Sequence, residues 1–265
     1  MDPAFYSKLH DVQTRHWWYA ARRDLLAEIV RGLGPLPPGT IYDLGCGVGA
    51  NLPVLQRFGP TIGVDGAKEA VTFCHERGFA EVHQADLGRL EGLVPGSASL
   101  VVLADVLEHL DDERPCLEAV HDLLAEGGAL VVTVPAYMFL WGPGDVLVHH
   151  KRRYTERRLR EVVAPVFDVE WTSYFNTFLF GATAVARFAE RLLDRPGHEA
   201  AGVPPGPVNG ALRAIFSAER HLLRRHVHLP FGVSILCIAR RRAGNAARAS
   251  GRQGQGPNRR LPHTP

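Results

Sequence analysis

The residues with the clearest chemical meaning lie in the sequence IYDLGCGVG, which begins at Ile41. A short apolar run ends in Asp43, and three glycines follow at every second position: Gly45, Gly47 and Gly49. Because glycine has no Cβ, the chain can turn sharply here and a ligand can lie against the backbone. The pattern predicts a strand, a glycine turn and then a helix over 50–58 whose first N–H groups face the ligand.

A second acidic residue follows at a distance typical of a nucleoside site. The apolar run 61–64 ends in Asp65, about 20 residues after Gly45. An acid at this place accepts hydrogen bonds from both ribose hydroxyls of an adenosine. The glycine turn and this acid together predict a nucleoside-binding site, with Gly66 next to the acid.

Strands and helices alternate regularly from residue 40 onward. We expect seven strands, at 40–44, 61–65, 81–86, 99–105, 129–135, 169–174 and 231–240. Near-continuous apolar runs such as LVVLAD and ALVVTV are typical of strands covered on both faces. The fold class predicted is therefore α/β, a Rossmann-like, mostly parallel sheet with helices on both faces. Ligands of such sheets bind beyond the carboxyl ends of the strands, where Asp43, Asp65, Asp86 and Asp105 lie.

These motifs, in this order, resemble the class I S-adenosylmethionine-dependent methyltransferases of the small-molecule type. DLGCGVG is similar to their first motif, Ala85-Asp86-Leu87 to the third-strand motif, and VVLADVLEHLDD to the fourth strand and its loop. LLAEGGALVVTVP is similar to the helix-turn-strand before their substrate loop. The resemblance is close over 41–135 and implies S-adenosylmethionine as cofactor and an antiparallel edge strand. It implies cofactor-binding roles for Asp43, Gly45, Cys46, Gly47, Asp65, Gly66, Asp86, Leu87, Ala104 and Asp105.

The chemistry of this cofactor fits the motif. S-adenosylmethionine carries a carboxylate and an ammonium group but no phosphate, which agrees with GxGxG rather than the dinucleotide pattern GxGxxG. Its sulfonium already activates the methyl group, so alignment and exclusion of water carry most of the catalysis. A general base is needed only if the acceptor loses a proton. The reaction requires no metal, and we expect none.

The acceptor side is predicted in segment 137–154, which follows the fifth strand. His149 or His150 is the candidate base, and only one can serve because neighbouring side chains of an extended chain point apart. Asp145, Arg152, Arg153 and Tyr154 are the candidate substrate-binding residues. The alternative is that this polar run only caps the loop. A metal site of Asp145, His149 and His150 is disfavoured because nothing else fixes its geometry. EHL is a feature of the family that the sequence resembles, so Glu108 and His109 are assigned to structure or to the cofactor's surroundings, with a base role for His109 as the less favoured alternative.

The rest of the chain divides into segments around this domain. We expect a helical lid at 1–39, in which Trp18 or Arg22 contacts the ligand, or alternatively an aromatic cluster that only packs on the sheet. The methyltransferase domain covers 40–242, with a helical insertion at 178–229 that partly covers the acceptor site. The uncharged segment 171–186 is too short to span a membrane and predicts a buried strand and an amphipathic helix, with Arg187, Glu190 and Arg191 facing water. Residues 243–265 read as a disordered tail.

Composition narrows the function. The chain has 265 residues, a net charge of +2 and four cysteines without CxxC spacing, which predicts a cytoplasmic protein without a disulfide framework. No apolar signal segment is visible at the N-terminus. We therefore expect methyl transfer to a small-molecule or lipid-linked acceptor, with peripheral membrane contact in the second case and no nucleic-acid partner. The alternatives are a non-catalytic S-adenosylmethionine-binding subunit or scaffold, and a nicotinamide-dependent oxidoreductase.

Overall fold

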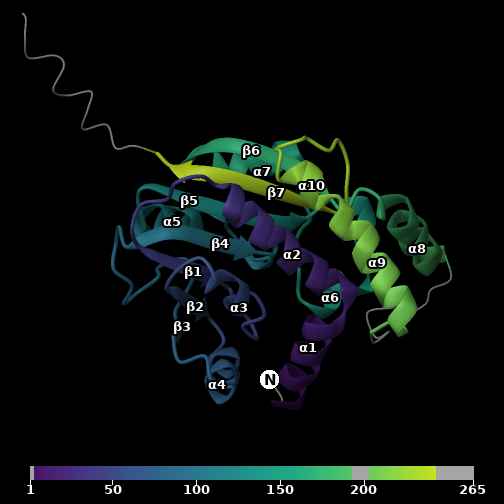
Figure 1. Cartoon of the computed structure of the whole chain (residues 1–265), viewed down its shortest axis with the longest axis horizontal. Coiled ribbons are helices and arrows are strands. Elements are labelled where there is room, and N and C mark those ends of the chain that lie inside the picture. The colour runs from purple at the N-terminus through teal and green to yellow at the C-terminus, as the bar shows by residue number, and fades with distance from the viewer. Residues whose placement is uncertain (1–2, 193–202, 243–265) are drawn as a thin grey trace, which may run out of the picture.

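The computed structural model describes residues 3–192 and 203–242 (Figure 1). In this part of the chain a seven-stranded sheet has the order β3-β2-β1-β4-β5-β7-β6. The strands are β1 (Thr40–Leu44), β2 (Thr61–Asp65), β3 (Val82–Gln84), β4 (Ala98–Ala104), β5 (Leu124–Pro135), β6 (Phe167–Phe175) and β7 (Ser234–Arg241). Strands β1 to β5 pair in parallel. The predicted Rossmann-like fold is confirmed.

The antiparallel strand lies one place inside the edge, which corrects the predicted edge position. β7 pairs antiparallel with β5 on one side and with β6 on the other, so β6 forms the edge. The first six residues of β7 are all buried, whereas burial in the first half of β6 is mixed. Apolar residues at every position suit an interior strand covered on both faces, and the continuous run ILCIA, after the buried Ser234, meets that condition.

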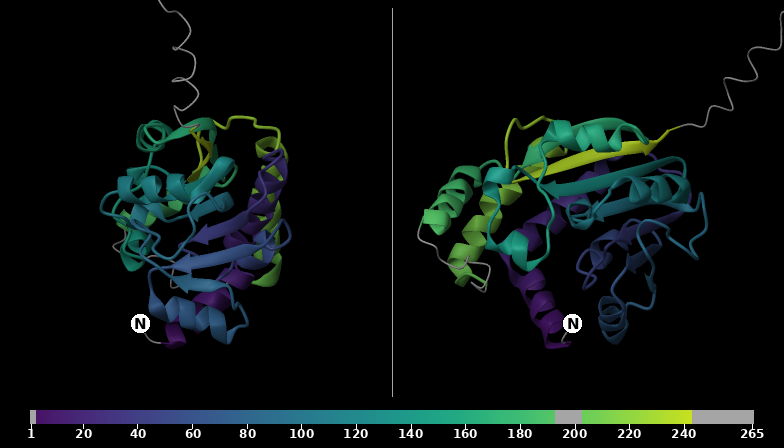
Figure 2. Two further views of the ribbon diagram at one scale, coloured as in Figure 1. Left: turned by 90° about the vertical axis from the view of Figure 1, so that its left-hand side faces the viewer. Right: turned by 180° about the vertical axis from the view of Figure 1, so that it is seen from behind.

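Helices cover both faces of the sheet (Figure 2). One face carries α2 (Trp17–Gly32), α9 (Gly206–Ala218) and α10 (Arg220–Leu223), and the other carries α5 (Arg114–Leu123) and α7 (Glu156–Val163). Along β4, Leu100 and Val102 belong to the core under α2, while Val101 and Leu103 belong to the core under α5. Successive strand residues point to opposite faces, so each face of β4 contributes to a separate core.

The helix after the glycine turn is shorter than predicted. α3 spans only Leu52–Leu55, not 50–58. The amides of Arg57 and Phe58 bond to carbonyls three residues back, which is the tight turn that commonly ends a helix, and Gly59-Pro60 follows directly. The helix dipole expected at the glycine turn is correspondingly weak. The amides of Gly45 and Cys46 already donate to the Val64 carbonyl, so the turn offers a ligand close backbone contact more than unused N–H donors.

Two helices precede the sheet, where the sequence predicted one. α1 (Pro3–Arg15) comes before α2 and packs next to α4 (Lys68–Glu76), with the rings of Tyr6 and Phe73 6.1 Å apart. Short helices follow β4 and β5: η1 (Leu107–His109), η2 (Met138–Leu140) and α6 (Pro143–Leu147). The segment after β4, which contains η1, and the segment after β5, which contains η2 and α6, both lie at the carboxyl end of the parallel strands, where ligands of this fold class bind.

The segment between β6 and β7 contains α8 (Phe180–Leu192), α9 and α10. The predicted orientation of α8 is wrong. Val185 and Phe188 are 71% and 68% exposed, whereas the side chains of Arg187 and Glu190 are only 15% and 10% exposed and form an ion pair of 3.0 Å. An ion pair satisfies both charges away from water, which leaves the apolar side chains on the outside. The side chain of Arg191 and the predicted tail lie outside the described residues.

In the described ranges, no helix combines the length and apolar character needed to cross a bilayer. This agrees with the expectation that segment 171–186 does not span a membrane. It forms the second half of β6, a short connection and the first half of α8.

Candidate active site

The glycine turn after β1 requires glycine and leaves one side open. Gly45, Gly47 and Gly49 all have positive φ, at 73°, 53° and 75°. A Cβ on Gly45 would lie 2.6 Å from Cγ2 of Val106, whereas a Cβ on Gly47 would meet nothing within 4 Å. Gly45 is therefore fixed by packing, and the open side of Gly47 offers room for a ligand against the backbone.

Asp65 lies beside this turn, as the sequence predicted. Its Oδ2 accepts a hydrogen bond of 2.8 Å from the Gly47 amide, and its Oδ1 accepts one of 2.9 Å from the Ala67 amide. The carboxylate thus ties the end of β2 to the glycine turn. It lies where a ligand on the turn could exchange these bonds for its own hydroxyl groups.

Asp43, at the end of β1, is a buried acid with incomplete pairing. It is 1% exposed, its side chain hydrogen-bonds with Asn51, and its Oδ2 has no partner in the described residues. Burial, reinforced by nearby Asp65, raises the pKa of Asp43 to about 7. A cationic group bound next to this carboxylate would compensate the burial cost.

A cleft of about 390 Å³ opens beyond β2 and β3. It is lined by Gly66, Asp86, Leu87, Gly88, Leu110, Asp111, Asp112, Pro115 and Cys116. Three of these residues, Gly66, Asp86 and Leu87, were predicted from the sequence to contact the cofactor. Of the others, Gly88 follows β3, Leu110, Asp111 and Asp112 belong to the VVLADVLEHLDD motif, and Pro115 and Cys116 lie in the first turn of α5, which no sequence pattern marked. Gly66, which lines the cleft, directly follows Asp65, so the cleft adjoins the Asp65 carboxylate and extends the same site.

Arg22 of α2 reaches the end of β4. Its guanidinium forms an ion pair with Asp105 and donates a hydrogen bond of 2.8 Å to Oγ1 of Thr133. It also lies over the ring of Trp18, 5.6 Å from the centroid, and Trp18 packs on Phe216 of α9. Of the two predicted lid residues, Arg22 lies at the ligand-binding edge, whereas Trp18 joins α2 to α9. Ala104, just before Asp105, packs against the core beneath α2.

Three backbone conformations at this edge are unusual. Asp105, Tyr137 and His149 have φ of 58°, 56° and 59°, in the left-handed region. Residues other than glycine adopt this region at a cost of about 1–3 kcal/mol, and residues with such strained backbones gather at functional sites. All three lie in the loops that follow β4 and β5.

A polar cluster lies between those loops. Glu108 is completely buried, and neither carboxylate oxygen has a hydrogen-bond partner elsewhere in the described residues. Its Oε1 is 3.8 Å from Nε2 of His150, and the rings of His150 and His109 are 4.7 Å apart. Burial, with a contribution from Asp105, raises the pKa of Glu108 well above its usual value. Burial and the neighbouring His150 lower the pKa of His109.

Asp145 fixes the orientation of His150. Its Oδ1 is 2.8 Å from Nδ1 of His150, and both its oxygens bond to the guanidinium of Arg153, at 2.8 and 2.9 Å. Oδ2 also accepts the Gly142 amide at the start of α6. Burial by itself raises the pKa of Asp145, but the hydrogen bonds from His150 and Arg153 outweigh it and hold the pKa at about 2. Asp145, which is itself held by Arg153 and the Gly142 amide, therefore fixes the orientation of the His150 ring.

Arg152 and Tyr154, predicted as substrate-binding, contact the protein itself. Arg152 donates to Oε1 of Glu113 at 2.8 Å, and the Tyr154 hydroxyl donates to the same oxygen at 2.9 Å. Tyr154 is 1% exposed. Asp145, Arg152, Arg153 and Tyr154 thus hold the segment after β5 in place, and their role in binding a substrate stays a prediction.

His149 and His150 are separated by the structure. His149 is exposed, whereas the side chain of His150 is only 14% exposed and faces Glu108. The sequence left the choice between them open, and it assigned no joint role to Glu108, His109 and His150. The only signal available was that EHL follows β4 and HHK follows β5, at the same end of two adjacent parallel strands.

Residues 42–132 match the family described as "Methyltransferase domain", which confirms the predicted resemblance over this part of the chain. The chain is 32% identical over 136 residues to trans-aconitate 2-methyltransferase of Sinorhizobium fredii, covering 50% of this chain and 49% of that protein. It is 27% identical over 143 residues to a ubiquinone biosynthesis O-methyltransferase of Paracidovorax citrulli, covering 48% and 60%. The matches thus span about half the length of these curated relatives.

Solved structures share the fold over nearly the whole chain. A complex of the Haloferax volcanii Trm112 methyltransferase activator with a putative methyltransferase contains a chain that aligns with a TM-score of 0.55 and 18% identity, covering 91% of this chain and 96% of that one. The Streptomyces coelicolor geranyl diphosphate C-methyltransferase, solved with Mg²⁺, geranyl diphosphate and S-adenosyl-L-homocysteine, aligns with a TM-score of 0.52 and 14% identity, covering 82% and 76%. At these identities the likeness concerns the fold.

Proposed function

We propose that this protein is a class I methyltransferase that moves a methyl group from S-adenosylmethionine to a small, partly apolar acceptor, which is lipid-linked in its natural form. The observation that carries the proposal is the combination of the open glycine turn at Gly47 with Asp65 and the adjoining cleft. These features lie at the carboxyl ends of β1 to β3, within the matched methyltransferase domain.

The cofactor fits this edge in one direction. Asp65 would hold the ribose hydroxyls, the cleft beside Asp86 and Leu87 would take the adenine, and Gly47 would lie under the amino-acid portion. The cofactor's ammonium group is then near Asp43, whose buried Oδ2 lacks a partner in the described chain. A bound cation next to this carboxylate offsets the cost of burying its charge. The loops after β4 and β5 would then border the methyl group.

The acceptor then meets the cluster of Glu108, His109 and His150. S-adenosylmethionine, when bound, would supply a methyl group that its sulfonium activates for in-line displacement by the acceptor, with a neutral thioether as the leaving group. A hydroxyl acceptor must lose its proton, and this cluster gathers three titratable side chains from the loops that follow β4 and β5. Of the two predicted base candidates, His150 is the one that lies in this cluster, since it faces the buried Glu108 and His149 is exposed.

A lipid-linked acceptor is supported by the surface around this cluster. Over 180–190, the part of α8 whose side chains the structure describes, every exposed residue is uncharged: Gly181, Ala182, Val185, Ala186 and Phe188. Further exposed apolar side chains follow on η2 and α6, namely Met138, Phe139, Val146 and Leu147. The two regions touch, because the rings of Phe139 and Phe180 are 6.2 Å apart. A contiguous apolar surface next to an active site is typical of contact with a lipid or an apolar partner.

Calorimetry tests the cofactor and a coupled assay tests the reaction. We expect S-adenosylmethionine to bind and NAD⁺ not to bind, because the turn lacks the pyrophosphate pattern. We then expect release of S-adenosylhomocysteine with a prenylated phenol at a higher kcat/KM than with the same phenol without its prenyl chain. Cofactor binding without turnover on any acceptor would favour the non-catalytic scaffold, and equal rates for both phenols would remove the lipid-linked acceptor.

A further inference from the structure

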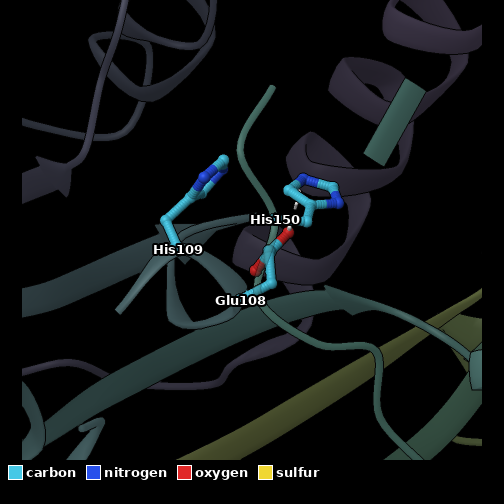
Figure 3. A group of neighbouring side chains, drawn as sticks. All are labelled: Glu108, His109 and His150. Atoms are coloured by element: carbon cyan, nitrogen blue, oxygen red, sulfur yellow. Dashed lines mark ion pairs between the residues drawn. The ribbon is translucent and has the colours of Figure 1, made fainter. Parts of the chain in front are cut away.

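Glu108, His109 and His150 present three potential metal ligands to one point. Each offers one ligand atom, and these atoms all lie within 4.8 Å of one another. Glu108 and His109 come from η1, and His150 comes from the segment that follows α6 (Figure 3). Two separate loops at the carboxyl end of the sheet therefore meet at these side chains, which is where the acceptor is expected.

The carboxylate of Glu108 lacks the partners that a buried acid needs. Both oxygens are buried without a hydrogen-bond partner elsewhere in the described residues, and Nε2 of His150 lies 3.8 Å from Oε1, beyond hydrogen-bond distance. Leaving a buried charged group unsatisfied costs several kcal/mol. The guanidinium groups of Arg22 and Arg153 act on Glu108 only through their charge, and Asp105 acts against them. A cation at this point would satisfy both oxygens.

The orientation of His150 also suits a metal ligand. With Nδ1–H donating to Asp145, the lone pair of Nε2 is free and faces Glu108. Histidine ligands of metals almost always donate their second ring nitrogen to a carboxylate or carbonyl in this way. Asp145 is itself held by two hydrogen bonds from Arg153. Metal sites commonly have such hydrogen-bonded partners around their ligands, and these partners orient the ligands.

We propose that Glu108, His109 and His150 bind a divalent transition-metal ion such as Zn²⁺. Two imidazoles and one carboxylate suit zinc or ferrous iron, whereas Mg²⁺ prefers a set of oxygen ligands. Three protein ligands leave open positions for water or a substrate oxygen. His150 is then a ligand and not a base. Binding of the ion does not depend on the proposed function. A role of the ion in lowering the pKa of the acceptor hydroxyl does rest on the proposed function.

Calorimetry on the full chain without an affinity tag tests the site. The protein is stripped with a chelator and titrated with ZnCl₂. We expect one tight site in the wild type and a loss of affinity of at least about 100-fold in His109→Ala, His150→Ala and Glu108→Gln. His83→Ala is the matched control, because His83 is a surface histidine 4.0 Å from a carboxylate, that of Glu81. This control should bind Zn²⁺ like the wild type.

Cobalt provides an independent readout. Co²⁺ in the site should give visible absorption bands characteristic of nitrogen and oxygen ligation, and these bands should be absent in Glu108→Gln. This variant keeps the volume of the side chain and removes the charge, so its melting temperature without metal should not fall. Asp145→Asn should weaken Zn²⁺ binding by about 10–100-fold without abolishing it. Equal Zn²⁺ affinity in the wild type and all three ligand variants, or no tight binding in the wild type, overturns the proposal. Titrations of the same samples with S-adenosylmethionine test the proposed function separately.

Discussion

Arg22 and Asp105 are 83 positions apart in the chain and form an ion pair at the carboxyl end of β4. Thr133 of β5 completes the contact by accepting from Arg22 and donating to Asp105 at 3.2 Å. The N-terminal helix α2 is therefore attached to the loop that precedes Glu108 and His109. Residues before the sheet thus help to set the geometry of the site.

Arg22→Ala should lower both stability and cofactor affinity. The change leaves the half-buried carboxylate of Asp105 without its cation, which should cost about 2 kcal/mol in the free energy of unfolding. Urea unfolding and calorimetry with S-adenosylmethionine measure the two effects. Arg114→Ala is the control, since its pair with Glu118 at 2.9 Å is exposed and should be worth less than about 0.5 kcal/mol. Equal losses in both variants would contradict a special role for Arg22.

Asp65→Ala should weaken S-adenosylmethionine binding by about 100-fold or more, because the ribose loses its charged acceptor. The structure adds a second effect, since the amides of Gly47 and Ala67 lose their partner. We expect a moderate fall in the melting temperature in addition to the loss of affinity. Asp86→Ala serves as the comparison, because its carboxylate bonds only locally, to the Gly88 amide at 2.8 Å. Unchanged affinity in Asp65→Ala would remove Asp65 from the ribose site.

Asp43→Asn should act in opposite directions on stability and binding. The pKa of Asp43 rises from 3.8 to about 7 on folding, so its contribution to stability is fully present below pH 3.8 and is lost as the pH rises through 7. The ligand-free Asn variant should therefore melt about 5 °C above the wild type at pH 8, and the difference should vanish near pH 4. Its affinity for S-adenosylmethionine should fall, because the ammonium group loses its counter-charge. A variant that binds as well as the wild type would place the ammonium elsewhere.

Asp145→Asn should remove part of the acid sensitivity of the protein. The pKa of Asp145 falls from 3.8 to about 2 on folding, so its stabilisation is present above pH 3.8 and is lost as the pH falls through 2. The melting temperatures of wild type and variant should differ most at pH 6 and converge toward pH 2. Asp111→Asn is the control, because the side chain of Asp111 is 92% exposed and its pairing with Lys151 should add little.

The double variant Val185→Asp, Phe188→Asp should lose affinity for anionic and neutral vesicles and for a prenylated acceptor. Both side chains are exposed, so the fold should be unaffected. Vesicle flotation and the KM for the prenylated phenol measure the effect, while the KM for the unprenylated phenol should stay constant. Val94→Asp controls for an added charge at another exposed valine, 67% exposed before β4. Flotation of the double variant at the wild-type level would exclude α8 as the contact surface.

The strands and the cofactor edge could be predicted because they depend on local patterns. Apolar runs such as that of β4 identify buried strands, and the spacing from Gly45 to Asp65 follows from the geometry of a strand, a turn and a crossover. The length of α3 could not be predicted in the same way, because its end depends on the tight turn before Pro60. Element boundaries depend on such terminal bonds more than on composition.

The cluster around Glu108 could not be predicted because it depends on how two loops approach each other. The distance from Glu108 to His150 is set by α6 and by the bond from Asp145 to His150, neither of which has a sequence pattern. The orientation of α8 was predicted wrongly for a related reason. The rule that charges face water fails when Arg187 and Glu190 neutralise each other, and their pairing is a tertiary result.

The place of β7 constrains the order in which the sheet is completed during synthesis. β7 is the last of the seven described strands to leave the ribosome, yet it lies between β5 and β6. Until residues 234–241 emerge, β5 and β6 each expose an edge of unpaired N–H and C=O groups. A nascent chain stalled before this point would expose unpaired edges on β5 and β6, which are prone to aggregation. The α8–α10 segment must be synthesised before β7 can pair with both strands.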